Sequence, residues 1–197
     1  MFLQRTESLR KSVSCPLMSS AFTHGFVALS FGKLFFPERM PVRFWVLSVV
    51  CTLLPDVDVI GFFLGVRYND TLGHRGFTHS LLFASTIAVL VTVAAFPAVR
   101  RFSKHWWALT ASFFVSTASH GVLDAMTDGG YGVAFFSPFS DARLFLPWRP
   151  LEVAPIGVRG FFSRWGWDVL LSEWLYIWLP VTLLLVIVYR VRGQRSG

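Results

Sequence analysis

Five apolar runs alternate with short polar segments along this chain of 197 residues. The runs cover residues 17–36, 42–54, 81–99, 106–126 and 169–189. About 20 mainly apolar residues are enough for a helix to cross a lipid bilayer. The pattern therefore predicts an all-α, polytopic membrane bundle of about five transmembrane helices. Pro55 is expected to end or kink the second helix, and residues 59–66 are expected to form a further re-entrant or interfacial piece.

The polar segments predict how the chain is organised. Residues 1–17 form a polar N-terminal extension without the apolar core of a secretory signal peptide, and either Met1 or Met18 is the start of translation. Residues 18–190 are expected to form a single integral membrane domain, which a polar tail at 191–197 follows. Within the domain, residues 131–168 form a long loop rich in Phe, Trp, Pro and Arg before the last helix.

The composition agrees with a membrane protein. Apolar residues make up 54% of the chain, charged residues make up 15%, and the mean hydropathy is +0.56. A soluble domain of this length is less apolar and more charged. The net charge of +7 comes from Lys and Arg grouped at the ends of apolar runs, which is the distribution that sets membrane topology. A nucleic-acid partner is therefore not expected.

The segment Gly73–Ser80 lies between two apolar runs and contains His74, Arg75 and His79. Ionisable groups beside membrane segments usually mark a functional site. Alternate connections of a five-helix bundle lie on the same side of the membrane, so the remaining His and Asp near helix ends are expected to gather at this segment. The resulting set of candidate metal ligands is His24, Asp56, Asp58, His74, His79, His120 and Asp124.

Imidazoles and carboxylates in this number suit a divalent metal. Zinc is favoured, and manganese or iron would also fit. His120 and Asp124 are four residues apart on a predicted helix, so they share a face and can hold one ion. Asp56 and Asp58 point the same way in an extended segment and diverge in a helix, and Pro55 permits either. The His-Glu-x-x-His helix of zinc proteases does not occur in the sequence.

Other interpretations stay open at this point. A single histidine in a helix, such as His24, is more often packed and hydrogen-bonded, and Asp56 alone can cap a helix. A proton-coupled transporter also gathers Asp and His at a membrane site, although transporters usually show repeats and helices broken at mid-membrane. A non-catalytic scaffold that binds a regulator is a third class, against which the small soluble surface counts.

Three blocks of the sequence carry a resemblance to a known family: Leu53–Asp58, Gly73–Ser80 and Ser119–Asp124. With them the chain resembles, over about residues 20–155, the LexA-binding, inner-membrane-associated, metal-dependent hydrolases of bacteria. It is more distantly similar to the zinc-dependent phospholipase C and single-strand nuclease superfamily. That similarity implies metal ligands at His24, Asp56, His79, His120 and Asp124. No histidine follows His120 to match the later ligands of the superfamily, so one or two ions are expected.

The residues and the resemblance together predict a membrane-embedded, metal-dependent hydrolase, phosphoesterase-like, acting on a phosphoester or diphosphate bond in a lipid. The expected ligands of the first ion are Asp56, His79, His120 and Asp124. The expected ligands of a second ion are His24 and a bridging Asp124, assisted by Asp58 or His74.

Further residues are expected to act on the substrate. Arg75 is placed to neutralise a phosphate, and Asp58 is the candidate general base if it is not a ligand. Residues 135–139 and 144–150 resemble a lid in the headgroup zone, and the alternative is that they only seal the end of the bundle. Arg143, Trp148 and Arg149 of this loop are expected to contact an anionic lipid substrate.

The distribution of Lys and Arg predicts the orientation. Their density is higher in the short turns and the tail opposite the candidate site than on the site face, and such segments set topology. The C-terminus is therefore expected in the cytoplasm of a bacterium, and the metal site on the outer face of the inner membrane.

Overall fold

The computed structural model describes residues 19–36, 39–154 and 162–194, and its regular elements are helices. The expected polar extension at 1–17, Met18 and residues 195–197 of the tail lie outside the described residues. In chain order the elements are α2 (Ala21–Phe35), α3 (Val42–Leu53), η1 (Leu54–Val59), α4 (Ile60–Phe63), η2 (Phe77–His79), α5 (Leu81–Ala95), α6 (Lys104–Ala125), α8 (Arg164–Glu173), η3 (Trp174–Trp178) and α9 (Leu179–Gln194). The predicted all-α class is confirmed.

The second predicted helix is longer than expected because the helical path continues past Pro55. The α-helix α3 ends at Leu53, and the 3-10 helix η1 and the short α4 carry the path on to Phe63. Pro55 lies in the first turn of η1 and has no backbone N–H to donate, yet the helical path continues past it in 3-10 geometry. Residues 59–63 therefore extend this helix and do not form the separate piece predicted for 59–66.

The last helix is also longer than predicted. It begins at Arg164 with Ser163 as its N-cap and runs through the π-helical turn η3 to Gln194. The long aromatic loop consequently ends five residues earlier than expected, and the first residues of the predicted tail belong to α9.

The helices α5 and α6 begin at serine caps. The hydroxyl of Ser80 accepts a hydrogen bond from the amide of Phe83, as serine commonly does at a helix N-terminus, and Ser103 caps α6 in the same way. The helix α5 ends at Ala95, before the predicted end at residue 99, because Pro97 disfavours helical geometry at the residue that precedes it.

Among the residues that the structure describes, two helical stretches are long and apolar enough to cross a membrane. They are Val42–Phe63 and Arg164–Gly193, each with a mean hydropathy of 1.9. The helix α5 is apolar but has only 15 residues. The structure thus supports a helical membrane protein with two candidate spans, while five spans stay a prediction.

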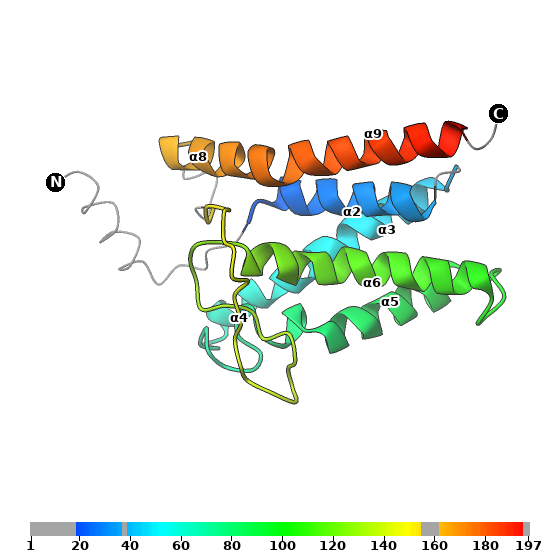
Figure 1. Ribbon diagram of the computed structural model, residues 1–197. Helices are drawn as coiled ribbons and strands as arrows, with labels where there is room; N and C mark the ends of the chain where they lie inside the picture. The colour runs from blue at the N-terminus through cyan, green and yellow to red at the C-terminus, as the bar shows by residue number, and fades with distance from the viewer. Residues whose placement is uncertain (1–18, 37–38, 155–161, 195–197) are drawn as a thin grey trace.

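The helices pack so that one end of the bundle gathers the candidate site. The helices α2, α3, α5 and α6 lie against one another, and α8 to α9 runs along α2 (Figure 1). The start of α2, the end of α3 and the end of α6 meet at the end where the long loop folds over the bundle (Figure 1). The larger apolar cluster of the described core consists of Phe36, Phe44, Cys51, Ala88, Phe96, Leu109 and Phe113, and a second consists of Val27, Leu123, Leu151 and Ile177.

Candidate metal centre

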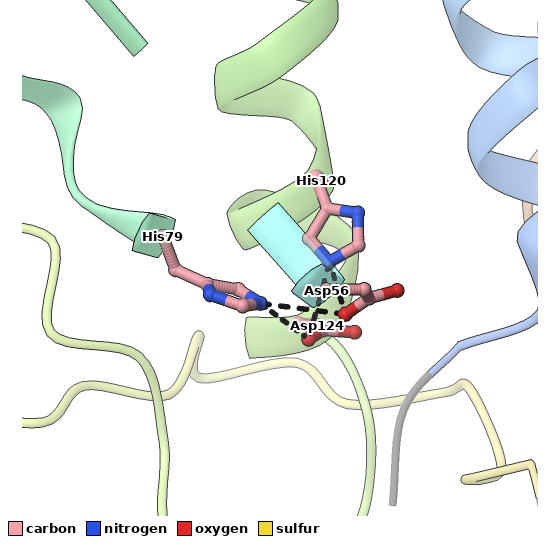
Figure 2. Close-up of side chains that lie close together, drawn as sticks. All are labelled: Asp56, His79, His120 and Asp124. Carbon is pink, nitrogen blue, oxygen red and sulfur yellow. Dashed lines mark hydrogen bonds and ion pairs between the residues drawn. The ribbon is translucent and has the colours of Figure 1, made fainter. Parts of the chain in front are cut away.

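Two imidazoles and two carboxylates meet at this end of the bundle (Figure 2). Asp56 comes from η1, His79 from η2, and His120 and Asp124 from α6. One potential ligand atom of each residue lies within 4.8 Å of the others. His120 Nε2 is 3.1 Å from Asp56 Oδ1 and 3.8 Å from Asp124 Oδ2. His79 Nε2 is 3.7 Å and 3.5 Å from the same two oxygens.

This arrangement fits a divalent cation. Ligands about 2.0–2.2 Å from a tetrahedral zinc ion lie roughly 3.3–3.6 Å from one another, close to the four measured distances. His79 Nε2 is buried and makes no hydrogen bond within the described part of the chain, and the buried Asp124 Oδ2 makes none there either, although it forms an ion pair with Arg75 Nε at 3.1 Å. Buried polar atoms normally have a partner, and a cation between these two atoms would serve both. The mixed nitrogen and oxygen set suits zinc and also manganese.

Helix geometry explains which side chains reach the centre. His120 and Asp124 are one turn apart on α6, so the prediction that they share a face is confirmed. Residues two apart in a 3-10 helix, which has three residues per turn, diverge by about 120°. Asp56 therefore faces α6, whereas Asp58 faces the loop before α5. The side chain of Asp56 is 18% exposed and those of His120 and Asp124 are fully buried.

Each ligand imidazole is held by its other nitrogen. His120 Nδ1 lies 2.7 Å from the carbonyl oxygen of Thr52, and His79 Nδ1 lies 3.2 Å from Asp58 Oδ2. A proton on each Nδ1 can be donated to these oxygens, which leaves both Nε2 atoms free to bind a cation. Metal-binding histidines in proteins are commonly oriented in this way.

The electrostatics of the centre favour a positive charge. Burial alone would lower the pKa of His79, but the carboxylates of Asp124, Asp56 and Asp58 outweigh it and raise the pKa well above the usual 6.5. A metal that binds at Nε2 therefore has to displace a proton from His79 near neutral pH.

Asp58 lies on the far side of the His79 ring from the other ligands. Its Oδ1 is 2.8 Å from His74 Nδ1, and its Oδ2 accepts a hydrogen bond of 2.7 Å from the hydroxyl of Thr78. Both oxygens of Asp58 are thus engaged within the protein, and its role as general base stays a prediction. Asp58, His74 and His79 also form a second group of clustered ligand atoms, so the geometry is compatible with a second ion there.

His24 lies beside the centre but outside both groups of clustered ligand atoms. Its ring stacks on that of His120, with 3.8 Å between the centroids. Its Nε2 is 2.7 Å from the hydroxyl of Ser19 and 3.9 Å from Asp124 Oδ1. Neither group of clustered ligand atoms found among the described residues includes His24, so the second-ion set predicted around it stays a prediction, and its ring packs against that of His120.

Arg75 is turned into the protein. Its side chain is fully buried, and its φ of 61° lies in the left-handed region. Its Nε is 3.1 Å from Asp124 Oδ2, and its guanidinium donates to the carbonyl of Gly129 and the hydroxyl of Thr127. The structure thus gives Arg75 a carboxylate partner within the protein, and its contact with a substrate phosphate stays a prediction.

Two glycines allow the loop around Arg75 to fold so tightly. A Cβ atom at Gly73 would overlap the carbonyl oxygen of Arg67, and one at Gly76 would overlap that of Thr71. Only glycine avoids these clashes. The glycines of the Gly73–Ser80 block therefore serve the backbone that presents His74, Arg75 and His79.

Arg143 holds the same loop from outside. Its guanidinium donates to the carbonyls of His74 and Tyr68, both at 2.9 Å, and lies over the ring of Tyr68. These bonds make Arg143 a support of the loop, and its contact with the substrate stays a prediction.

The aromatic loop is fastened to the ends of two helices. The amide of Leu81 donates to the carbonyl of Phe135, and the amide of Leu146 donates to the carbonyl of Ala125. These bonds support the interpretation that the loop seals the bundle. The predicted substrate residues that stay exposed on it are Trp148 and Arg149.

Sequence reasoning did not identify Ser19, Thr52 or Thr78 as parts of the centre. Thr78 could have been found, because it lies next to His79 within the Gly73–Ser80 block. Thr52 contributes its backbone carbonyl, which leaves no side-chain signal in a sequence. Ser19 reaches Asp124 across 105 positions of the chain, a contact that no local pattern reveals.

Comparisons with known proteins agree with a membrane location. The sequence profile of the YdjM inner membrane protein family matches residues 18–195. The inner membrane protein YbcI of Escherichia coli (strain K12) is 37% identical over 173 residues, which cover 85% of this chain and 95% of YbcI. No solved structure matches the protein. Because the profile match spans nearly the whole chain, the protein belongs to the YdjM inner membrane protein family.

Proposed function

We propose that this protein is a metal-dependent hydrolase of the bacterial inner membrane that cleaves a phosphoester or diphosphate bond in a lipid. The observation that carries the proposal is the convergence of Asp56, His79, His120 and Asp124 on one point at the end of the bundle. Ionisable side chains are costly beside a membrane and usually persist there for function. Zinc is the favoured ion, and manganese is the alternative.

A divalent ion in this group would activate water for attack and offset negative charge on the phosphoryl oxygens. Neighbouring groups of the protein orient the side chains that would bind this ion. Asp58 orients His79, the Thr52 carbonyl orients His120, and Arg75 fixes Asp124. The partly exposed side of Asp56 is the side from which a substrate would approach.

A lipid substrate is supported by the surface around the centre. Large apolar side chains are exposed on the segments that surround it, including Phe63 at 87%, Phe139 at 83% and Leu64 at 78%. Such residues are stable among lipid headgroups and chain ends. A substrate that resides in the same layer would reach the centre without leaving the membrane.

The test uses the full chain purified in detergent. We expect about one equivalent or more of bound zinc or manganese, and metal-dependent release of phosphate or a phospho-headgroup from phospholipids or polyprenyl phosphates. A chelator should abolish the activity, and Arg101→Gln, at an exposed position in the turn before α6 and at the opposite end of that helix from the ligand group, serves as a folded control.

Two outcomes would replace this proposal. Bound metal without turnover on any lipid would favour a scaffold that binds a soluble regulator. LexA is a candidate regulator, because the family that the chain resembles is named for binding LexA. Absence of metal after mild purification, together with proton-coupled uptake in vesicles, would favour a transporter.

A further inference from the structure

Glu173 is a buried acid that the proposed mechanism does not use. It ends α8, and its side chain has no exposed surface. Its Oε1 accepts a hydrogen bond of 2.6 Å from the amide of Ser20. Its Oε2 accepts bonds from the hydroxyls of Ser20 at 2.5 Å and Thr23 at 2.8 Å. A carboxylate buried in this way is costly unless it is fully bonded, and all three donors belong to the first turn of α2 and its cap.

The residue before this cap reaches the metal centre. The amide and the hydroxyl of Ser19 both donate to Asp124 Oδ1, at 3.2 Å and 3.1 Å. Asp124 Oδ2 then faces His79 Nε2 at 3.5 Å and Arg75 Nε at 3.1 Å. The consecutive amides of Ser19 and Ser20 thus donate to two buried carboxylates from different helices.

We infer that Glu173 is a positioning residue for the metal centre. It fixes Ser20, and because Cα atoms of neighbouring residues are only about 3.8 Å apart, it also fixes Ser19. Ser19 in turn holds Asp124 in the rotation that presents Oδ2 to the cation. This inference rests on the proposed metal centre.

A second contact strengthens the link from the last helix. The indole Nε1 of Trp178 donates to the hydroxyl of Thr23 at 2.7 Å, while that hydroxyl donates to Glu173. Trp178 also stacks on Phe26 of α2, with 5.2 Å between the ring centroids. The last helix therefore holds the start of α2 through two side chains one turn apart.

The test measures zinc affinity of the full chain in detergent by competition with a chromophoric chelator. Glu173→Gln keeps the length of the side chain but removes its charge and one acceptor. Asp168→Asn is the matched control, because Asp168 is exposed on the same helix. Loss of an outer partner of a metal ligand typically weakens metal binding about 10–100-fold, so we expect at least about a tenfold loss in Glu173→Gln and less than about twofold in the control.

A double-mutant cycle with Ser19→Ala separates positioning from general stability. Ser19→Ala should weaken zinc binding in the wild type but have much less effect in Glu173→Gln, because both changes release the same carboxylate. Independent effects of the two changes would overturn the inference. If Glu173→Gln does not fold, Ser20→Ala takes its place in the cycle, since it removes one donor to Glu173 and keeps the charge.

The outcomes distinguish the two proposals. Wild-type zinc affinity in folded Glu173→Gln, even with a lowered melting temperature, would refute the positioning role alone. A wild-type protein that binds no zinc or manganese would refute the metal centre and the positioning role with it.

Discussion

Replacing Arg75 with Gln should destabilise the protein before any substrate is added. The buried guanidinium lies 3.1 Å from Asp124 Oδ2, and Gln would leave that carboxylate without its cation. Removing one partner of a buried ion pair costs about 3–5 kcal/mol. At roughly 2–4 °C per kcal/mol for a chain of this size, the melting temperature should fall by about 6–20 °C.

Zinc should restore part of this loss, because it binds the folded state and places a positive charge beside Asp124. The assay is thermal unfolding in detergent, followed by tryptophan fluorescence, first with a chelator and then with zinc. Arg149→Gln is the control, since Arg149 is exposed and stacks on Phe145. Its melting temperature should stay close to that of the wild type.

The opposite pattern would refute this reasoning. If Arg75→Gln melts like the wild type in chelator and loses only its affinity for substrate, Arg75 acts on the substrate, as the sequence alone predicted. The ion pair with Asp124 would then contribute little to the folded state.

Three further predictions concern the centre and its sidedness. His120→Ala should lose its bound metal by elemental analysis while His105→Ala retains it, and equal metal content in both would remove His120 from the site. Because the pKa of His79 is raised above 6.5, zinc affinity should fall by about tenfold per pH unit as the pH drops below that pKa. Zinc binding near pH 7 should also release a proton from His79. Calorimetry in two buffers of different ionisation enthalpy measures the number of protons released, and a value of zero would contradict the prediction. A reporter fused after Gly197 should be active in the cytoplasm, and activity of a periplasmic reporter at that position would reverse the orientation.

The meeting of the His and Asp side chains could be predicted because it depends only on where helices end. The spacing of four between His120 and Asp124 was a second reliable signal, since it fixes a shared helical face. The different directions of the Asp56 and Asp58 side chains could not be predicted, because they depend on the local 3-10 geometry, which Pro55 permits but does not require.

The buried position of Arg75 could not be predicted for a similar reason. Its left-handed backbone turns the side chain inward, and residues other than glycine and asparagine rarely adopt that conformation. The sequence does, in contrast, contain a signal that marks Glu173 as a candidate functional residue. Glu173 is the only acid in the predicted run 169–189, and an ionisable group within such a run is a functional candidate by default.

The hydrogen bonds from Glu173 to Ser20 also bear on the order of biogenesis. All four clustered ligands precede residue 125, so a ribosome has made them long before it reaches Glu173. On the inferred role of Glu173, a nascent or truncated chain would carry the ligands without the contact that sets Asp124 in place. High-affinity metal loading would then be delayed until the last helix has been inserted, and a chain cut short before α8 would be marked by its failure to retain the ion.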